Sequence, residues 1–191
     1  MDNDSGPHRL IVAITGASGA IYGIRALFHL SKVPAVETHL IISAAGKRTI
    51  IEETDYTVAS VSELADVSYD PRDIGAAVAS GSFRTAGMLI APCSVKTLSS
   101  VAYSHDGELI SRAADVCLKE RRRIVLMVRE TPLHAGHIEM MAAATRSGAI
   151  IMPPVPAFYS KPANLEELVD HSIGRALDLF EIDTALVKRW G

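Results

Sequence analysis

The chain has 191 residues, of which 48% are hydrophobic and 21% are charged. That length can bury one sizeable core and is short for two full domains. The 22 acidic residues outnumber the 19 basic ones, so the formal net charge is −3. This balance argues against a broad basic surface for nucleic acid or for an anionic membrane.

The N-terminal segment, the hydropathy and the cysteines together predict one soluble domain. Residues 1–8 are polar and acidic and predict a loose tail, which leaves residues 9–191 as one domain. No apolar stretch approaches the ~18 residues of a spanning helix, so we expect no membrane insertion. The two cysteines, Cys93 and Cys117, are far apart and suit neither a zinc ribbon nor a disulfide framework. We therefore expect a cytoplasmic protein.

Short aliphatic runs alternate with amphipathic segments along the whole chain. The runs, which predict strands buried on both faces, are 9–15, 38–43, 87–91, 123–129 and 149–152. The amphipathic segments, which predict helices, are 20–32, 44–53, 95–104, 109–122, 135–147 and 165–180. Residues 54–83 are less regular, and 73–79 is the best short helix there. This order predicts an α/β fold, a parallel sheet with helices on both sides.

Small, hydroxyl and cationic residues follow each predicted strand. In an open parallel sheet, ligands bind beyond the carboxyl ends of the strands. The segments at these ends are 15–20 (TGASGA), Ser43, 92–97 (PCSVKT), 129–132 (RETP) and the proline-rich loop 153–162, which carries Tyr159. Their composition predicts a crevice for an anion.

The GASGA loop is the strongest single motif. Its glycines allow close approach of the backbone, and the helix that follows offers free N–H groups to a phosphate; a tight strand-to-helix turn is the alternative. Lys-Ser or Lys-Thr does not follow the glycines, so this is not a P-loop. Ser43 stands where a dinucleotide site usually has an acid, and Glu37 is at the wrong end of its strand. A mononucleotide fits better.

Several polar groups have a plain structural interpretation as well as a functional one. Ser94 and Thr97 can cap a helix or hold a phosphate, and Arg129 can cap a neighbouring helix or face a ligand. The basic segment 119–123 ends a helix, where cations favour the dipole, and does not indicate nucleic-acid binding. The spacing of His134, His137 and Glu139 does not form a standard closed metal site, so packing or capping is favoured there.

Five motifs in order, GASGAIYG, PCSVKTLS, SRAADVCLKERR, VRETPLH and MPPVPAFY, resemble the UbiX family of flavin prenyltransferases. The likeness runs from residue 9 to residue 190. It implies a three-layer α/β/α, Rossmann-like or flavodoxin-like fold that binds FMN. It also implies homo-oligomers, typically dodecamers, with sites at subunit interfaces.

The reaction that the resemblance implies joins the dimethylallyl group of dimethylallyl phosphate to N5 and C6 of reduced FMN. The prenylated FMN serves UbiD-type decarboxylases, in ubiquinone biosynthesis or in aromatic acid decarboxylation. No metal is required, because cations and hydroxyl donors can stabilise a departing monophosphate.

The resemblance also implies roles for individual residues. Glu53 corresponds to a residue lent by a neighbouring subunit, and Trp190 to an aromatic side chain near the prenyl group. The implied FMN contacts are Gly16, Ala17, Ser18, Ser43, Ser94, Val95, Lys96, Thr97 and Arg129. The implied contacts to dimethylallyl phosphate are Tyr159, Arg175, Lys119, Arg129 and Trp190, and the implied catalytic residues are Ser18, Glu53, Lys119 and Glu130.

Two other functions share the expected fold. One is an FMN-dependent decarboxylase of the cysteine-decarboxylase type, against which the segment 92–97 argues, since it reads PCSVKT in place of a PASANT-like motif. The other is a flavin-carrier subunit of an aromatic-acid decarboxylase, which would not need Lys119, Tyr159 and Arg175. The segment 103–108 (YSHDGE) fits no pattern and is expected near the site or at an oligomer contact.

Overall fold

A computed structural model describes residues 8–187 and shows one six-stranded sheet in the order β3-β2-β1-β4-β5-β6. Every neighbouring pair of strands is parallel. The strands are β1 (His8–Ile14), β2 (Val36–Ile42), β3 (Val67–Tyr69), β4 (Gly87–Cys93), β5 (Arg123–Val128) and β6 (Ile150–Ile151). The predicted parallel sheet is confirmed.

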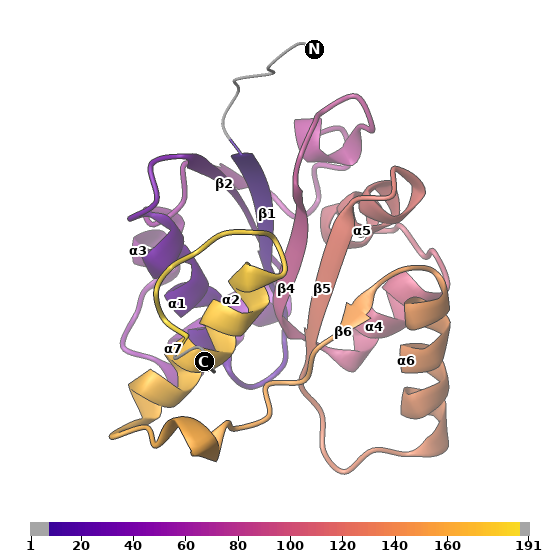
Figure 1. Cartoon of the computed structure of the whole chain (residues 1–191). Coiled ribbons are helices and arrows are strands. Elements are labelled where there is room, and N and C mark those ends of the chain that lie inside the picture. Colours follow the sequence, from indigo (N-terminus) through magenta and orange to yellow (C-terminus); the bar gives the residue numbers. More distant parts are fainter. Residues whose placement is uncertain (1–7, 188–191) are drawn as a thin grey trace.

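Helices cover both faces of the sheet and complete the three-layer architecture (Figure 1). One layer contains α1 (Ala20–Leu30), α2 (Ala44–Glu53), α3 (Val58–Ser62) and α7 (Leu165–Asp178). The other contains α4 (Val95–Ala102), α5 (Leu109–Lys119) and α6 (Ala135–Arg146). Two hydrophobic clusters, one on each face of the sheet, form the core.

The central strands have the composition that this position requires. Residues 10–14 of β1 and all of β4 are buried, because helices cover them on both faces. Gly23 brings α1 close to the sheet: a Cβ added there would lie 2.3 Å from the carbonyl oxygen of Ala91 and 2.5 Å from Cγ1 of Ile14. A side chain at position 23 would force α1 away from the sheet.

The segment between α2 and β4 differs most from expectation. It contains the helix α3 and the edge strand β3, and the short helix predicted over 73–79 is only the 3₁₀ turn η1 (Ala77–Ala79). Strand β3 has three residues, pairs with residues 39–41 of β2 and has no aliphatic run. A strand this short is formed by its pairing with the neighbouring strand, so the periodicity of its own sequence does not predict it.

Element ends differ from the sequence expectation by a few residues. The helix predicted over 109–122 ends at Lys119, and Arg121 then takes a left-handed conformation (φ 57°). The strand predicted over 149–152 is reduced to Ile150–Ile151. The helix predicted over 44–53 is confirmed residue for residue. Among residues 8–187, no helix is long and apolar enough to cross a membrane.

Candidate functional site

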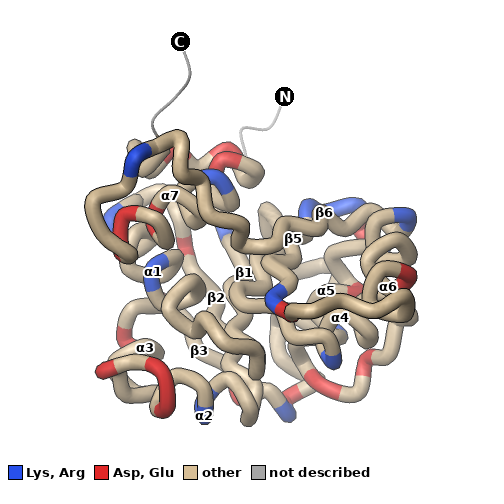
Figure 2. The backbone as a smooth tube through the Cα atoms, turned by 90° about the horizontal axis from the view of Figure 1, so that it is seen from below, with Lys and Arg blue, Asp and Glu red and all other residues tan. Residues whose placement is uncertain are grey.

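A crevice of about 570 Å³ opens at the carboxyl ends of β1, β2 and β4. Figure 2 looks onto this end of the sheet, with α1 and α2 on one side and α4 and α5 on the other. The crevice is lined by Gly16, Ser43, Ala44, Ala45, Ser94, Val95, Lys96, Thr97, Ser100, His105, Gly107, Glu108, Ile110 and Ser111. Six of the predicted FMN contacts are therefore in one cavity.

The crevice coincides with the point where the strand order reverses. The chain runs from β1 outward to β2 and β3 and then returns to β4 on the other side of β1. The Thr15 hydroxyl bridges the two strands, since it donates to the carbonyl oxygen of Pro92 at 2.7 Å and accepts from the Ser94 N–H at 2.9 Å. Thr15 is 1% exposed, so this buried bridge fixes the rim at the switch point.

Two helices begin at the crevice with a serine cap. The Ser43 hydroxyl caps α2 and accepts from the Gly46 N–H at 2.9 Å. The Ser94 hydroxyl caps α4, accepting from the Thr97 N–H at 3.3 Å and lying 3.0 Å from Oγ1 of Thr97. These hydroxyls, with the nearby N–H groups, form a donor-rich surface of the kind that binds phosphate.

Position 16 has no room for a side chain. A Cβ added there would lie 2.2 Å from Cβ of Ala45, at the start of α2. The GASGA loop and α2 therefore form a close wall of the crevice. This narrow, hydroxyl-lined hollow fits the phosphate and polyol parts of a flavin mononucleotide.

The side chain of Glu53, the last residue of α2, contacts the GASGA loop of its own chain. Its Oε2 accepts from the Gly19 N–H at 2.7 Å and from the Ala20 N–H at 3.4 Å. The resemblance implies a glutamate lent by a neighbour, whereas here the carboxylate meets the first N–H groups of α1 within the chain. A carboxylate is favoured at a helix N-terminus, so the N-terminus of α1 already has an anionic partner, and α2 and α4 remain for a phosphate.

Arg129 and Glu130 follow β5 on the far side of β4. The Arg129 N–H donates to the carbonyl oxygen of Cys93 at 3.1 Å. Burial raises the pKa of the Tyr22 phenol, and the positive charge of Arg129 opposes that rise, so the guanidinium acts on the first turn of α1. Glu130 Oε1 accepts from the Thr131 N–H at 3.0 Å. This pair thus forms a second polar group at the same end of the sheet.

The segment 103–108 is part of the crevice wall. His105, Gly107 and Glu108 line the cavity, and the Glu108 carboxylate pairs with the Lys96 ammonium at 3.0 Å. The sequence predicts the segment 103–108 near the site or at an oligomer contact, and three of its residues line the crevice; Ser100 and Ser111 were not predicted. A topological signal was present, because this segment joins α4 to α5 and so was free to approach the ligand end of the sheet.

Four predicted phosphate contacts, Arg129 and the three described next, are not among the crevice-lining residues of the same chain. Lys119 ends α5 four residues before β5 begins and contacts the Glu120 carboxylate, at the amino ends of the strands. Arg175 is in the last turn of α7 and pairs with Asp178 at 2.9 Å. Tyr159 is in the 3₁₀ turn η2 (Phe158–Ser160) and is exposed. Trp190 lies outside the described residues.

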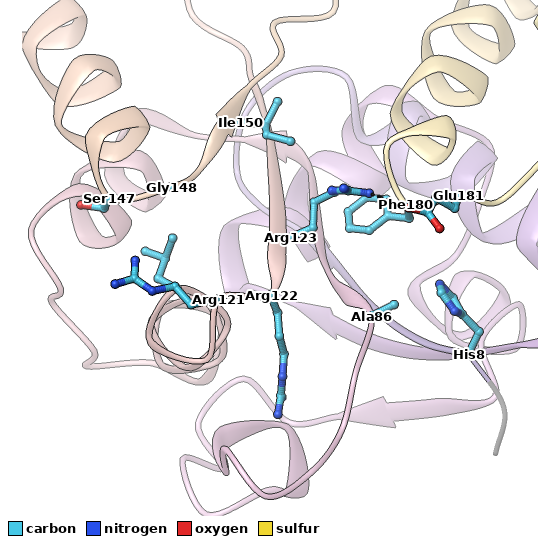
Figure 3. Close-up of a pocket in the computed structure, with 11 residues that line it drawn as sticks. His8, Ala86, Arg121, Arg122, Arg123, Ser147, Gly148, Ile150, Phe180 and Glu181 are labelled. Carbon is cyan, nitrogen blue, oxygen red and sulfur yellow. Dashed lines mark ion pairs between the residues drawn. The ribbon is translucent and has the colours of Figure 1, made fainter. Parts of the chain in front are cut away.

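A second hollow, of about 590 Å³, lies at the opposite, amino end of the sheet. Figure 3 shows that the side chains of Arg121, Arg122 and Arg123 at this hollow point in different directions. Arg122 donates to the carbonyl oxygens of Gly81 and Phe83, and Arg123 donates to that of Leu179. Because two of the three guanidiniums hold backbone segments, we assign this basic cluster a structural role.

The His134 and His137 side chains also have a structural explanation. The His134 ring caps α6 by accepting from the Gly136 N–H at 3.1 Å, and the two rings lie 3.7 Å apart. Within residues 8–187, no cluster of three or more His, Cys, Asp or Glu side chains could hold a metal ion.

Comparison with known proteins agrees with this site. The Flavoprotein family matches residues 1–188. The flavin prenyltransferase UbiX of Thauera aromatica is 53% identical over 182 residues, which cover 95% of this chain and 93% of that protein.

Two solved structures share nearly the whole fold. AnUbiX (PadA1), crystallised in complex with FMN and dimethylallyl pyrophosphate, is 50% identical with a TM-score of 0.95, covering 97% of this chain and 98% of that one. The dodecameric, FMN-dependent UbiX-like decarboxylase of Escherichia coli O157:H7 is 45% identical with a TM-score of 0.93, covering 96% and 99%. With its crevice at the switch point and these relatives over almost its full length, the chain belongs to the UbiX family of flavin prenyltransferases.

Proposed function

We propose that the crevice binds FMN and that the enzyme transfers a dimethylallyl group to it from dimethylallyl phosphate. The observation that carries the proposal is the pair of serine-capped helices, α2 and α4, that begin on one rim of the switch-point crevice. A phosphate held by Ser43, Ser94 and Thr97 would accept hydrogen bonds from hydroxyl and backbone N–H donors. Reduced FMN, when bound, supplies the nucleophilic N5 and C6 atoms of the reaction.

Charged side chains are present both on the rim of the crevice and beyond β5. Lys96 supplies a cation on the same rim, while Arg129 and Glu130 supply a cation and a carboxylate beyond β5. During transfer the carbon–oxygen bond of the prenyl phosphate breaks, and negative charge develops on the leaving oxygen. Cations and hydroxyl donors directed at that oxygen stabilise the transition state. Lys96, which lines the crevice, and Arg129, which follows β5, are two such cations.

Neighbouring copies supply the remaining phosphate contacts in this proposal. Lys119, Tyr159 and Arg175 are not among the crevice-lining residues of their own chain. The UbiX-like decarboxylase of Escherichia coli O157:H7, 45% identical, is a dodecamer. We propose that this chain also forms a homo-oligomer, a dodecamer, in which these side chains complete the crevice of another copy.

Co-expression of two impaired variants, assayed at an FMN concentration too low to saturate Ser94→Ala, tests this assembly. Ser94→Ala weakens the flavin site of its own crevice, whereas Lys119→Ala removes a contact that we assign to a different one. Co-expressed, the two should form some intact sites and recover about a quarter of the activity if random pairing applies. No recovery, with both variants folded and oligomeric, would show that Lys119 does not act across subunits.

The transfer itself is tested without oxygen. Protein, reduced FMN and dimethylallyl phosphate are mixed, and mass spectrometry looks for a flavin heavier by one C5H8 unit. Folded, flavin-loaded protein that forms none of this product would overturn the proposal. Parallel reactions with dimethylallyl pyrophosphate, the ligand crystallised with AnUbiX, define the preferred donor.

The product would pass to a UbiD-type decarboxylase. The free cysteines Cys93 and Cys117 fit a reducing compartment, and we place the reaction in the cytoplasm.

A further inference from the structure

The Tyr159 side chain is exposed, yet its phenol is in contact with a buried group. Tyr159 is 64% exposed and follows the proline-rich segment after β6. Its hydroxyl lies 3.4 Å from Nε2 of His171, and the two rings meet edge to face with centroids 5.5 Å apart. A long hydrogen bond and a ring contact therefore act together on one orientation of the phenol.

His171 is held on a fixed support. It is 6% exposed, and Ser172 and Ile173, which follow it in α7, are also buried. The preceding residue, Asp170, receives hydrogen bonds from Arg25 of α1 at 2.5 and 2.7 Å. Because this pair fixes α7 against α1, the buried imidazole of His171 is a fixed support for the Tyr159 side chain.

The neighbour of His171 along the helix is a second predicted phosphate contact. Arg175 stands four residues after His171 in α7, and side chains at this spacing are neighbours on a helix surface. The Tyr159 phenol thus contacts α7 from the turn η2, at the residue one helical turn before Arg175. The resemblance assigns both Tyr159 and Arg175 to the prenyl phosphate but gives His171 no role.

We propose that His171 is a positioning residue for the dimethylallyl phosphate site, acting through Tyr159. With its proton on Nε2, the imidazole donates to the phenol oxygen, and the phenol proton is then directed outward, to a phosphate oxygen. Such a chain of donors is cooperative. The inference rests on the proposed function for the identity of the anion, while the contact between His171 and Tyr159 is a property of this chain.

A double-mutant cycle on binding separates this role from simple packing. The dissociation constant of dimethylallyl phosphate is measured by calorimetry on the full-length protein loaded with oxidised FMN, in which transfer does not occur. His171→Phe keeps a ring of similar size and removes the hydrogen bond, and we expect it to weaken binding roughly 5- to 20-fold. Tyr159→Phe should cost about the same, and the double variant no more than either single one.

His171→Gln is the matched control. The glutamine amide N–H can reach the position of Nε2, so binding should return to within about threefold of the wild-type value. FMN affinity should change far less than dimethylallyl phosphate affinity in every variant, because Tyr159 is assigned to the prenyl phosphate and His171 acts through Tyr159.

The possible outcomes separate the inference from the proposed function. Losses that multiply in the double variant, or equal losses in His171→Gln and His171→Phe, would overturn the inference, since His171 would then act by packing alone. Coupled losses in binding without prenyl transfer in the wild-type protein would support the inference and overturn the proposed function. Transfer with uncoupled losses would do the reverse.

Discussion

The Glu53 carboxylate accepts a hydrogen bond from the Gly19 N–H at 2.7 Å and so joins the end of α2 to the start of α1. Gly19 is in a left-handed conformation, with φ 100°, and contributes no side-chain cap. The glutamate takes the part that an N-cap side chain usually has. A residue that the resemblance marks as catalytic therefore also supports the GASGA loop.

Glu53→Ala should lower both stability and activity. We expect a loss of about 1 kcal/mol in the free energy of unfolding, the usual effect of a removed helix cap, and at least a tenfold fall in prenyl transfer. Urea unfolding and the anaerobic assay measure the two effects. Glu52→Gln is the control, because Glu52 pairs with Arg48 on the exposed side of α2; equal defects in the two variants would refute a special role for Glu53.

Ser94→Ala should weaken flavin binding by about 10- to 100-fold, the range for a lost hydrogen bond to a charged group. It should also cost about 1 kcal/mol of stability, because Ser94 caps α4. Thr57→Ala removes a comparable cap from α3, which does not line the crevice. Fluorescence titration with FMN should therefore separate two variants of similar stability, and equal flavin affinities would place the phosphate elsewhere.

Glu108→Gln should strengthen flavin binding. Glu108 pairs with Lys96 at 3.0 Å on the crevice wall, so its charge competes with a bound phosphate for the ammonium. Both side chains are well exposed, which limits the expected gain to about two- to fivefold. The gain should shrink as salt is raised.

Asp106→Asn is the control for Glu108→Gln, since Asp106 pairs with Arg112 and not with Lys96. Lys96→Gln should have the opposite effect and weaken FMN binding. Tighter binding in both Lys96→Gln and Glu108→Gln would contradict this electrostatic account.

Asp66 should make stability depend on pH in the acid range. Hydrogen bonds from the N–H and hydroxyl of Thr38, at 2.7 and 2.8 Å, lower the pKa of its carboxyl below the ordinary value. A carboxyl whose pKa is lower in the folded state stabilises the fold above its unfolded pKa of about 3.9, and this contribution is lost as the pH falls through the folded value.

The test for Asp66 is the free energy of unfolding of Asp66→Asn between pH 7 and pH 3. The variant should be less stable than wild type at pH 7, and the difference should narrow below about pH 4. Asp55→Asn, at an exposed position outside the strands and helices, is the control. A difference that stays constant over the whole range would mean that Asp66 acts through shape and not through charge.

The sequence predicted the central layers of the fold well because their signal is local. Residues 87–91 form a continuous apolar run, and the helix over 44–53 begins at a serine cap. Strand β3 lacks such a signal, since it depends on pairing with residues 39–41 and on Asp66, which holds Thr38 of β2 across 28 positions of sequence. Long-range contacts of this kind leave no local pattern.

The candidate site divides in the same way. Ser43 and Ser94 follow strands, so the rule that ligands bind beyond the carboxyl ends placed them together. Lys119 and Arg175 are near the C-terminal ends of helices that run back to the amino ends of the strands. Both residues therefore lie far from the crevice of their own chain, which is at the carboxyl ends. Helix direction was available from the predicted order of elements and would have separated them.

Both outer strands of the sheet are very short, with three residues in β3 and two in β6. A short edge presents few free N–H and C=O groups, so it offers little to a strand from another molecule. Copies of this chain are therefore guarded against joining their sheets into a continuous ribbon. We therefore expect association between copies to use helices and loops, which can bring side chains of one copy to the crevice of another.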